Sequence, residues 1–424
     1  MELHLLPAQQ LIEKLMGEAL LRVMSSPLYA KIQEIRQGHW DCGRLEEPSE
    51  VSPLANICEH WKDRLGREQI ANVERRIPEV VPPWWKPPDA RISDTAEEAE
   101  RLHKAATESQ DRVAIYTDGS SVDGYVGAAA VAPTISEAQT AKMGRSSAMT
   151  VYGAELQGIK MALEIVLRAV QERNRRFTIF TDNQAAIRAV TNPRGQSGQF
   201  LLIGIVIDLL ELQERGIEVE LQWIPAHRGT AGNEEADRLA KEAARGQVDG
   251  GLRPEDRVPG QGGNRSLTAA LKQQINRIVH DDWKRAWQTH RNGRELRAIM
   301  QEPTRKVLDL HRSTKRAHST IIIQMRTAKI GLRHFLHRSR VPGYETGDCG
   351  CGQGRQTVRH VLFACRTHAD LRESYRTGTD GHHWTTDLRA MLSQRTTAIT
   401  AARFMIATRL LKQFGAIQAA EEDD

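Results

Sequence analysis

The stretch Val113-Ala114-Ile115-Tyr116-Thr117-Asp118-Gly119-Ser120 is the starting point for the fold, because an apolar run rich in aromatic and β-branched residues leads into an acid and a glycine. The run Phe177-Thr178-Ile179-Phe180-Thr181-Asp182 has the same order and the same Thr-Asp pair. Both runs predict buried strands that end at the acid. If these strands are neighbours, Asp118 and Asp182 converge at one end of a sheet, where their charges repel unless a cation lies between them.

The segments around these two strands predict a mixed α/β sheet. The turn-rich residues Gly119 to Gly124 separate Val113–Thr117 from a second strand, Tyr125–Ala132, which indicates a hairpin, and a third strand is expected around Lys142 to Thr150. The elements expected after it are a helix from Val151 to about Arg173, the strand Phe177–Thr181, helices over Asn183–Val190 and Phe200–Arg215, the strand Glu218–Trp223 and a helix over Gly232–Arg245. Antiparallel strands followed by alternating strands and helices are typical of a mixed sheet covered by helices.

Two further acids fall on the predicted helices. Glu155 shares a helical stripe with Ile159, Ala162 and Val166, and Asp237 shares one with alanines 240 and 244. Taken alone, each acid is more simply a turn, cap or solvated residue. As a set without a balancing Lys or Arg cluster, the four carboxylates form a hard oxygen site that suits Mg²⁺ or Mn²⁺ and does not suit zinc.

The motifs that carry these acids resemble those of type 1 ribonuclease H. They are Val113–Ser120, Tyr152-Gly153-Ala154-Glu155-Leu156, Phe180-Thr181-Asp182-Asn183-Gln184, and Trp223-Ile224-Pro225-Ala226-His227-Arg228-Gly229 with Gly232-Asn233-Glu234-Glu235-Ala236-Asp237. The acids stand in the family's order, D, E, D, D, and the match covers about a third of the chain. The resemblance implies a ribonuclease H-like mixed five-stranded sheet flanked by helices.

The resemblance also implies an activity, the endonucleolytic hydrolysis of the RNA strand of an RNA/DNA hybrid with two Mg²⁺ or Mn²⁺ ions. By this analogy Asp118 binds both ions, Glu155 and Asp182 complete the shell of one, and Asp237 binds the other ion or its water. The analogy makes His227 a proton shuttle or an aid to product release, and a solvated loop histidine is the alternative.

Residues next to the acids are candidates for substrate binding by the same analogy. Main-chain groups of Gly119 and Ser120 could recognise the 2′-hydroxyl that distinguishes RNA from DNA. Asn183 and Gln184 could touch backbone or sugar, although helix capping explains Asn183 equally well. Asn233 and Glu234 could position substrate or product. The basic residues between Asp182 and Asp237 are scattered, so no basic helical protrusion is expected there; they are Arg188, Arg194, Arg215 and Arg228.

The length of 424 residues and the composition are typical of a soluble chain with two or three domains. We expect a helical and irregular appendage and linker over residues 1–110, the ribonuclease H domain over 111–247, a flexible Gly/Pro-rich linker over 248–266, and a basic, mainly helical region over 267–424. Within the first part, the proline-rich run Val80–Pro88 excludes regular helix or central strand and is interpreted as a linker.

The region after the linker is basic. Arg265 to Arg340 holds 18 Lys and Arg against 5 Asp and Glu, a net of +13. Apolar residues at helical spacing, among them Leu271, Ile275 and Trp283, predict amphipathic helices. The charge predicts either phosphate binding, with nucleic acid as the partner, or an ordinary solvated surface.

A Cys-rich constellation follows in the same region, with Cys349, Cys351, His360 and Cys365 in the spacing C-x-C-x8-H-x4-C. The cluster suggests one Zn²⁺, although the spacing is not that of a standard zinc finger, and reduced cysteines with a helical histidine are the alternative. The run Arg326-Thr327-Ala328-Lys329-Ile330-Gly331-Leu332 followed by this cluster resembles the C-terminal region of fungal non-LTR retrotransposon polyproteins. That resemblance implies a retroelement product from which the polymerase part is missing.

Composition excludes several classes of protein. The longest apolar run, Phe200–Leu212, is short and contains Asp208, so no membrane insertion is expected, and five cysteines in so long a chain favour a reducing, intracellular compartment, nuclear or cytoplasmic for a retroelement product. Two competing functions stay open. One is a nucleic-acid-binding remnant that has lost cleavage, which the presence of all four acids and His227 disfavours. The other is an integrase-like DNA strand transferase, which needs a different spacing of three acids.

Overall fold

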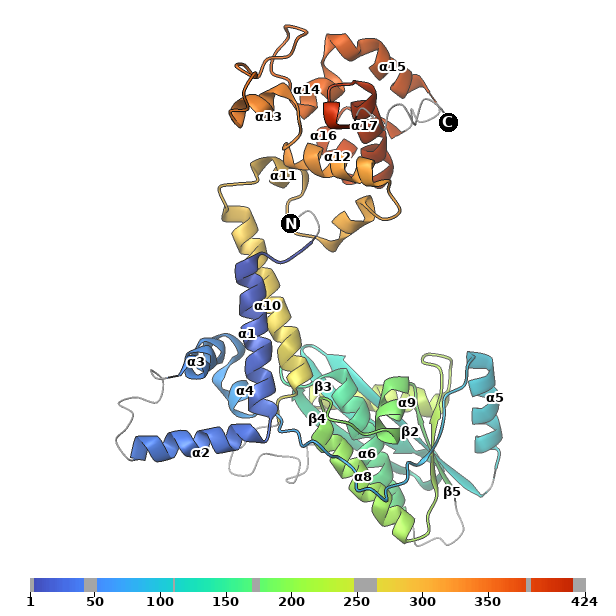
Figure 1. Cartoon of the computed structure of the whole chain (residues 1–424). Helices are drawn as coiled ribbons and strands as arrows, with labels where there is room; N and C mark the ends of the chain where they lie inside the picture. Colours follow the sequence, from blue (N-terminus) through green and yellow to red (C-terminus); the bar gives the residue numbers. More distant parts are fainter. Residues whose placement is uncertain are drawn as a thin grey trace. The chain divides into compact units, whose positions relative to one another are not determined.

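The structure is a computed structural model that describes residues 4–41, 52–109, 111–169, 176–247, 265–378 and 383–414 (Figure 1). The chain divides into two compact units, Glu13–Ile278 and a second unit made of Met1–Ile12 with Val279–Asp424. Most of the predicted linker over 248–266 lies outside the described residues.

The first unit contains a six-stranded mixed sheet with the order β1-β6-β5-β2-β3-β4. Its strands are β1 (Asp89–Arg91), β2 (Arg112–Val122), β3 (Tyr125–Ala132), β4 (Glu137–Arg145), β5 (Arg176–Thr181) and β6 (Val219–Trp223). Its helices are α5 (Ala96–Thr107), α6 (Val151–Ala169), α7 (Gln184–Thr191), α8 (Gln199–Glu214) and α9 (Ala231–Arg245), and the 3-10 turn η1 spans Pro133–Ile135. The predicted mixed sheet flanked by helices is therefore confirmed.

Three details differ from the prediction. The strand β2 continues through Val122, so Asp118 lies inside a strand opposite Ala129 and not at its end. The turn is formed by Asp123 and Gly124 alone, both with positive φ, as a tight two-residue hairpin requires. The third strand spans Glu137–Arg145 and not 142–150, because its exposed polar residues at the sheet edge hide the alternation that marks a strand.

The sheet has six strands and not the predicted five, and the additional strand, β1, comes from the segment that follows the proline-rich run. Residues 89–91 pair in parallel with Glu220–Gln222, which extends the sheet beyond β6. The Glu220 carboxylate forms ion pairs with Arg91 and Arg112, each with an N–O distance of 2.7 Å. It thereby connects β1 to β2 across the sheet. Three residues are too short to give a strand pattern in the sequence.

Alternation along β2 divides the two faces of the sheet. Val113 and Ile115 are buried in a core shared with α6, α7 and α8, whereas Ala114 and Tyr116 face a smaller cluster with α5 and α9. On the second face, a Cβ atom at Gly127 would lie 2.3 Å from the carbonyl oxygen of Ala240, so this glycine lets α9 pack directly on β3. The active-site candidates lie where α6 and α9 approach the middle of β2.

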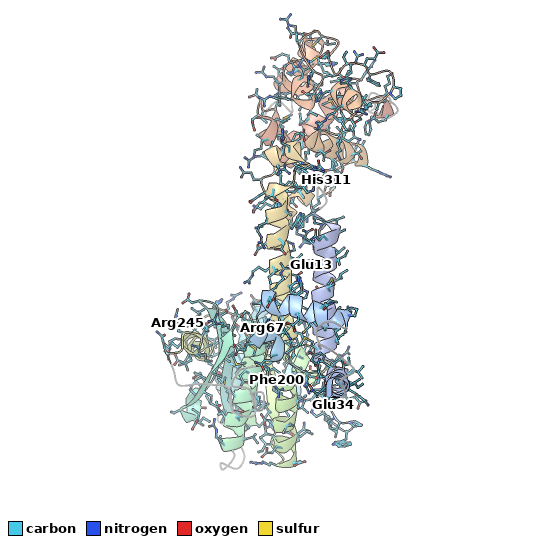
Figure 2. The ribbon with its side chains drawn as sticks, turned by 90° about the vertical axis from the view of Figure 1, so that its left-hand side faces the viewer. Glu13, Glu34, Arg67, Phe200, Arg245 and His311 are labelled. Atoms are coloured by element: carbon cyan, nitrogen blue, oxygen red, sulfur yellow. The ribbon has the colours of Figure 1, made fainter. Side chains whose placement is uncertain are left out.

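The N-terminal helices of this unit are α1 (Ala8–Ser25), α2 (Leu28–Asp41), α3 (Pro53–Leu65) and α4 (Arg67–Ala71). Helix α1 packs between α3 and the start of α10 (Thr268–Thr289): a Cβ atom at Gly17 would lie 2.8 Å from Trp61 on α3 and 2.9 Å from Ile275 on α10. Figure 2 places Arg67 on α4 and Phe200 at the start of α8; the guanidinium of Arg265 lies 4.9 Å from the Phe200 ring centroid.

A buried carboxylate holds these helices to the sheet domain. Glu74 is fully buried and accepts hydrogen bonds from the backbone N–H groups of Gly198 and Thr268, both at 2.7 Å, and from the hydroxyls of Ser197 and Thr268 at 2.5 and 2.8 Å. One side chain thereby caps the N-termini of α8 and α10.

The second unit is helical. Its helices after α10 are α11 (Arg294–Ile299), α12 (Arg316–Thr327), α13 (Arg333–Arg338), α14 (Val358–Phe363), α15 (Ala369–Thr377), α16 (Leu388–Ser393) and α17 (Arg395–Ala407), and its 3-10 turns are η3 (Arg305–Leu310), η4 (Arg366–His368) and η6 (Lys412–Phe414). Phe404 and Met405 of α17 are fully buried in a core with α12, α14 and α16. None of the described helices is both long and apolar enough for a membrane span.

Candidate active site

The parallel pairing of β2 with β5 brings the first two acids together. Thr117 is paired with Thr181, so Asp118 and Asp182 follow at matching positions on adjacent strands. The hydroxyl of Thr117 donates to the Phe180 carbonyl, and the indole N–H of Trp223 donates to the Asp182 carbonyl at 3.0 Å. Strand register alone therefore makes these two carboxylates neighbours.

Glu155 reaches the same place because α6 crosses β2 very closely. A Cβ atom at Gly119 would lie 2.6 Å from the backbone nitrogen of Glu155, which only glycine avoids. Carboxylate oxygens of Asp118, Glu155 and Asp182 all lie within 4.8 Å of one another. The three acids form a compact cluster, which we call the acidic triad.

The electrostatics of the acidic triad are those of a cation site. Burial, together with the charges of Asp182 and Asp237, raises the pKa of Asp118 to about 7. Burial and the neighbouring acids raise the pKa of Glu155 well above its ordinary value, and burial raises that of Asp182. Among the described residues, the buried Oε2 of Glu155 has no hydrogen-bond partner. Oxygen donors that repel one another and lack a balancing cation fit a hard divalent ion.

Asp237 lies beside the triad on α9. It lies close enough to Asp118 and Asp182 for its charge to contribute to their raised pKa values. Its Oδ2 is 2.6 Å from Nζ of Lys241, one helical turn further along. The structure therefore brings all four acids to one region, with the fourth held by a lysine that the sequence analysis did not single out. An i, i+4 acid–lysine pair was the available signal.

The neighbouring amides support the acids. The side chain of Asn183 caps α7 by accepting from the Ala186 N–H at 3.0 Å, and its amide offsets part of the rise in the pKa of Glu155 that burial causes. The structure shows the helix cap, and contact with substrate backbone or sugar stays a prediction. The side chain of Asn233 is buried and offsets part of the rise in the pKa of Asp182 that burial causes, and its Oδ1 has no hydrogen-bond partner among the described residues.

The remaining predicted site residues are more open. His227 is exposed in the loop before α9 with a φ of 55°, and it lies close enough to Asp182 to offset part of the rise in the pKa of that acid that burial causes. Gln184 accepts from Arg188, Glu234 is exposed in the first turn of α9, and Ser120 is half-buried on β2 beyond Gly119. These positions leave them accessible to a ligand at the triad.

The Cys-rich constellation is also assembled, in the second unit. Cys349 and Cys351 lie in a turn closed by the bridge between Asp348 and Arg355, whereas His360 is on α14 and Cys365 follows it. Ligand atoms of all four residues lie within 4.8 Å of one another. The Sγ atoms of Cys349 and Cys365 are 3.6 Å apart, and Sγ of Cys351 is 3.2 Å from Nε2 of His360. The described cysteines are free thiols, so this Cys₃His cluster is not a disulfide.

The comparison with protein families agrees with this geometry for one part of the chain. Residues 110–245 match the family model described as RNase H, and this part of the chain is an RNase H domain. A solved structure similar to this chain is the N-terminal RNase H domain of rv2228c from Mycobacterium tuberculosis, determined as a fusion with maltose-binding protein. It is 21% identical over 32% of this chain and 96% of that chain, with a TM-score of 0.25.

Proposed function

We propose that the protein hydrolyses the RNA strand of RNA/DNA hybrids endonucleolytically, with two divalent metal ions, Mg²⁺ or Mn²⁺. The observation that carries the proposal is the acidic triad with Asp237 beside it, inside a domain that matches the RNase H family. Asp118, Glu155, Asp182 and Asp237 would hold the ions. Such ions, when bound, supply activation of the attacking water and stabilisation of the leaving oxygen.

The chain's own residues keep these acids in place. Gly119 allows α6 to carry Glu155 against β2, and the Asn183 and Asn233 amides orient Glu155 and Asp182. His227, exposed on its loop beside Asp182, is the group that would move a proton between the site and solvent. Gly119, Ser120, Asn183, Gln184, Asn233 and Glu234 border the site and would contact the hybrid.

Cleavage assays test this proposal. The protein is incubated with end-labelled RNA/DNA hybrid, double-stranded DNA and double-stranded RNA, with Mg²⁺ and with chelator. We expect cleavage of the hybrid's RNA strand alone, dependent on Mg²⁺ and abolished in Asp118→Asn. Cleavage that resists the chelator would reject the metal mechanism. A folded protein that binds the hybrid without cutting it would instead support the alternative, a nucleic-acid-binding remnant that has lost cleavage.

We also propose that the Cys₃His cluster binds one Zn²⁺. The 3.6 Å separation of two thiol sulfurs supports this, since tetrahedral Zn–S bonds of about 2.3 Å place sulfurs roughly 3.8 Å apart. Metal analysis of the purified protein should give one equivalent of zinc, and Cys351→Ala should lose it, whereas Cys58→Ala, a buried cysteine outside the cluster, should keep it. Zinc-free protein with an intact helical unit would reject this site.

We also propose that the chain is the product of a retroelement, on the basis of the run Arg326–Leu332 and the cysteine spacing after it. The basic region would then give the nuclease a second contact with nucleic acid.

A further inference from the structure

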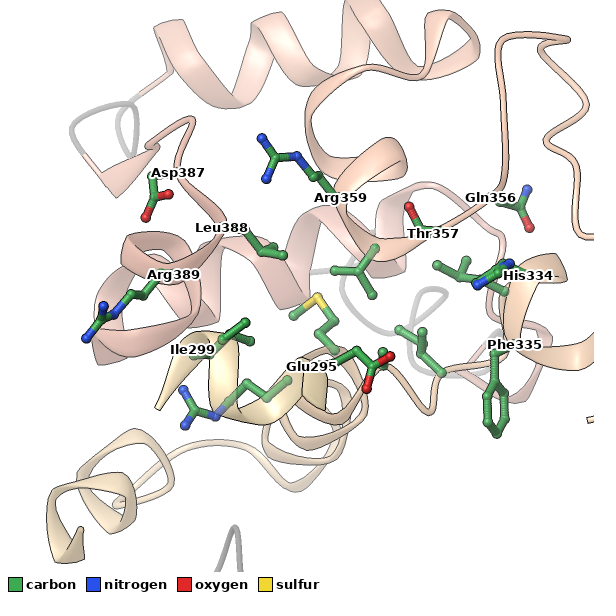
Figure 3. A pocket seen from close by; sticks show the side chains of 17 residues that line it. Glu295, Ile299, His334, Phe335, Gln356, Thr357, Arg359, Asp387, Leu388 and Arg389 are labelled. Carbon is green, nitrogen blue, oxygen red and sulfur yellow. The ribbon is translucent and has the colours of Figure 1, made fainter. Parts of the chain in front are cut away.

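A cavity of about 390 Å³ lies in the helical unit, outside the RNase H domain (Figure 3). Its apolar lining includes the buried Ile299, Met325, Leu332 and Val358 and the half-buried Phe335. A volume in the range of small-ligand sites, roughly 300–1,000 Å³, and an apolar lining together suit a planar or aliphatic group.

The charged groups at this cavity leave a positive excess. Arg359 and Arg389 are exposed, and within the described ranges neither guanidinium has a hydrogen bond or an ion pair. Two carboxylates also line the cavity: Asp387 accepts from the Ala390 N–H at 2.7 Å, and Glu295 is 3.8 Å from Arg338. With Arg326, the lining carries three arginines against these two carboxylates, a net positive charge of one.

The wall of the cavity that contains Gln356 and Thr357 is held firmly. Gln356 is buried, its Oε1 accepts from the Arg333 N–H at 2.9 Å, and its backbone N–H donates to the Gly347 carbonyl. Thr357 caps α14 by accepting from the His360 N–H at 3.2 Å. Figure 3 shows Arg359 and Arg389 on one side of the cavity and Phe335 on the other. A preformed wall lowers the entropic cost of binding.

We propose that this cavity binds single-stranded nucleic acid, with one unpaired base on the apolar lining and the flanking phosphates on Arg359 and Arg389. This deepens the nucleic-acid role proposed for the basic region. A free phosphate would satisfy the arginines but leave the apolar lining uncovered, whereas a nucleotide satisfies both. The segment Arg265 to Arg340, which includes part of the cavity lining, carries 18 basic residues against 5 acidic ones, and this charge favours a polyanion over an acidic peptide.

The test is titration of the full chain into fluorescein-labelled single-stranded RNA of about 16 nucleotides, followed by anisotropy over a series of salt concentrations. The Arg359→Gln/Arg389→Gln variant should bind the RNA about tenfold more weakly. The slope of the logarithm of the binding constant against the logarithm of salt concentration should become shallower by about 1.4, because two phosphate contacts to a single strand release about that many counterions. Ala298→Trp, which fills the cavity without changing charge, should weaken binding by about tenfold with an unchanged slope.

Arg75→Gln/Arg101→Gln is the matched control, because both arginines are also exposed and unpaired in the described structure but lie outside the basic region and do not line the cavity. RNA binding by this variant should stay within about twofold of wild type. Equal losses for the two double variants, or unchanged RNA binding in Ala298→Trp, would overturn the proposal. Circular dichroism and zinc content confirm that each variant is folded.

Hybrid cleavage by the same variants separates this inference from the proposed nuclease activity. The double variant should cleave a short hybrid at the wild-type maximal rate, because its changes lie outside the RNase H domain. Intact single-strand binding without any hybrid cleavage would leave the cavity proposal standing and reject the nuclease. Hybrid cleavage together with unchanged single-strand binding in the cavity variants would support the nuclease and reject the cavity proposal.

Discussion

Nζ of Lys241 lies 2.6 Å from Oδ2 of Asp237, one turn apart on α9. The Lys241 ammonium therefore forms an ion pair with one carboxylate oxygen of Asp237. A metal ion that binds this oxygen has to compete with the lysine. The pair is partly exposed, with side-chain exposures of 41% and 26%, so its contribution is modest, about 0.2–1 kcal/mol.

The first prediction follows from this competition. Lys241→Gln should lower the Mg²⁺ concentration that gives half-maximal hybrid cleavage by about threefold, since 0.2–1 kcal/mol corresponds to a factor of about 1.4–5. Mg²⁺ titration of initial rates measures this midpoint. Arg238→Gln is the control, because Arg238 pairs with Glu235 and Glu242 on the same helix and not with Asp237. A midpoint that rises in Lys241→Gln would contradict the competition.

The second prediction concerns pH. Because folding raises the pKa of Asp118 from 3.8 to about 7, ionisation of this carboxyl favours the unfolded state. The penalty is absent below about pH 4, grows as the pH rises towards 7 and is constant above it. Without added divalent ions, Asp118→Asn should therefore stabilise the protein at pH 8 by about 2–4 kcal/mol and by little at pH 4.

Urea unfolding of wild type and variant at both pH values measures this difference. Asp94→Asn, an exposed aspartate before α5, should change stability by less than about 0.5 kcal/mol at either pH. Mg²⁺ should stabilise the wild type and have little effect on Asp118→Asn at pH 8, since the ion binds the folded acids. A gain in the free energy of unfolding of Asp118→Asn that is the same at pH 4 and pH 8 would show that the charge of Asp118 is not its cause.

The third prediction concerns the approach of α6 to β2. Gly119→Ala places a Cβ atom 2.6 Å from the Glu155 nitrogen, and neither backbone can yield without moving the acid. We expect a loss of about 1–3 kcal/mol in stability and at least a tenfold fall in cleavage rate, because the catalytic geometry shifts. Gly195→Ala is the control, since its Cβ atom meets only a side-chain atom at 3.9 Å. Wild-type cleavage by Gly119→Ala would refute this explanation of the glycine.

The fourth prediction concerns Glu74. Glu74→Ala leaves two helix N-termini and two hydroxyls without their acceptor, which should cost about 3 kcal/mol. Glu74→Gln should cost less, because its carbonyl oxygen still accepts. Urea unfolding measures the stability of both variants. Glu79→Ala, a change at an exposed glutamate nearby in the chain, is the control. Equal stability of Glu74→Ala and wild type would show that the N-terminal helices are independent of the sheet domain.

Much of the sheet could be predicted because its strands are apolar runs between clear turns, and the Thr-Asp repeats indicate which strands are neighbours. Glu74 could not be predicted, because its partners lie 123, 124 and 194 positions away and an isolated glutamate carries no pattern. Lys241 was visible only as a local ion pair. The cavity of the helical unit could not be predicted either, since helical periodicity shows which residues are buried but not where packing leaves a space.

The short strand β1 has a practical consequence for anyone who wishes to isolate the nuclease domain. A fragment that starts at residue 110 would lose residues 89–91 and expose the backbone of β6 as a free edge. Unpaired edges recruit strands from other molecules, so such a fragment should self-associate unless the preceding segment is retained.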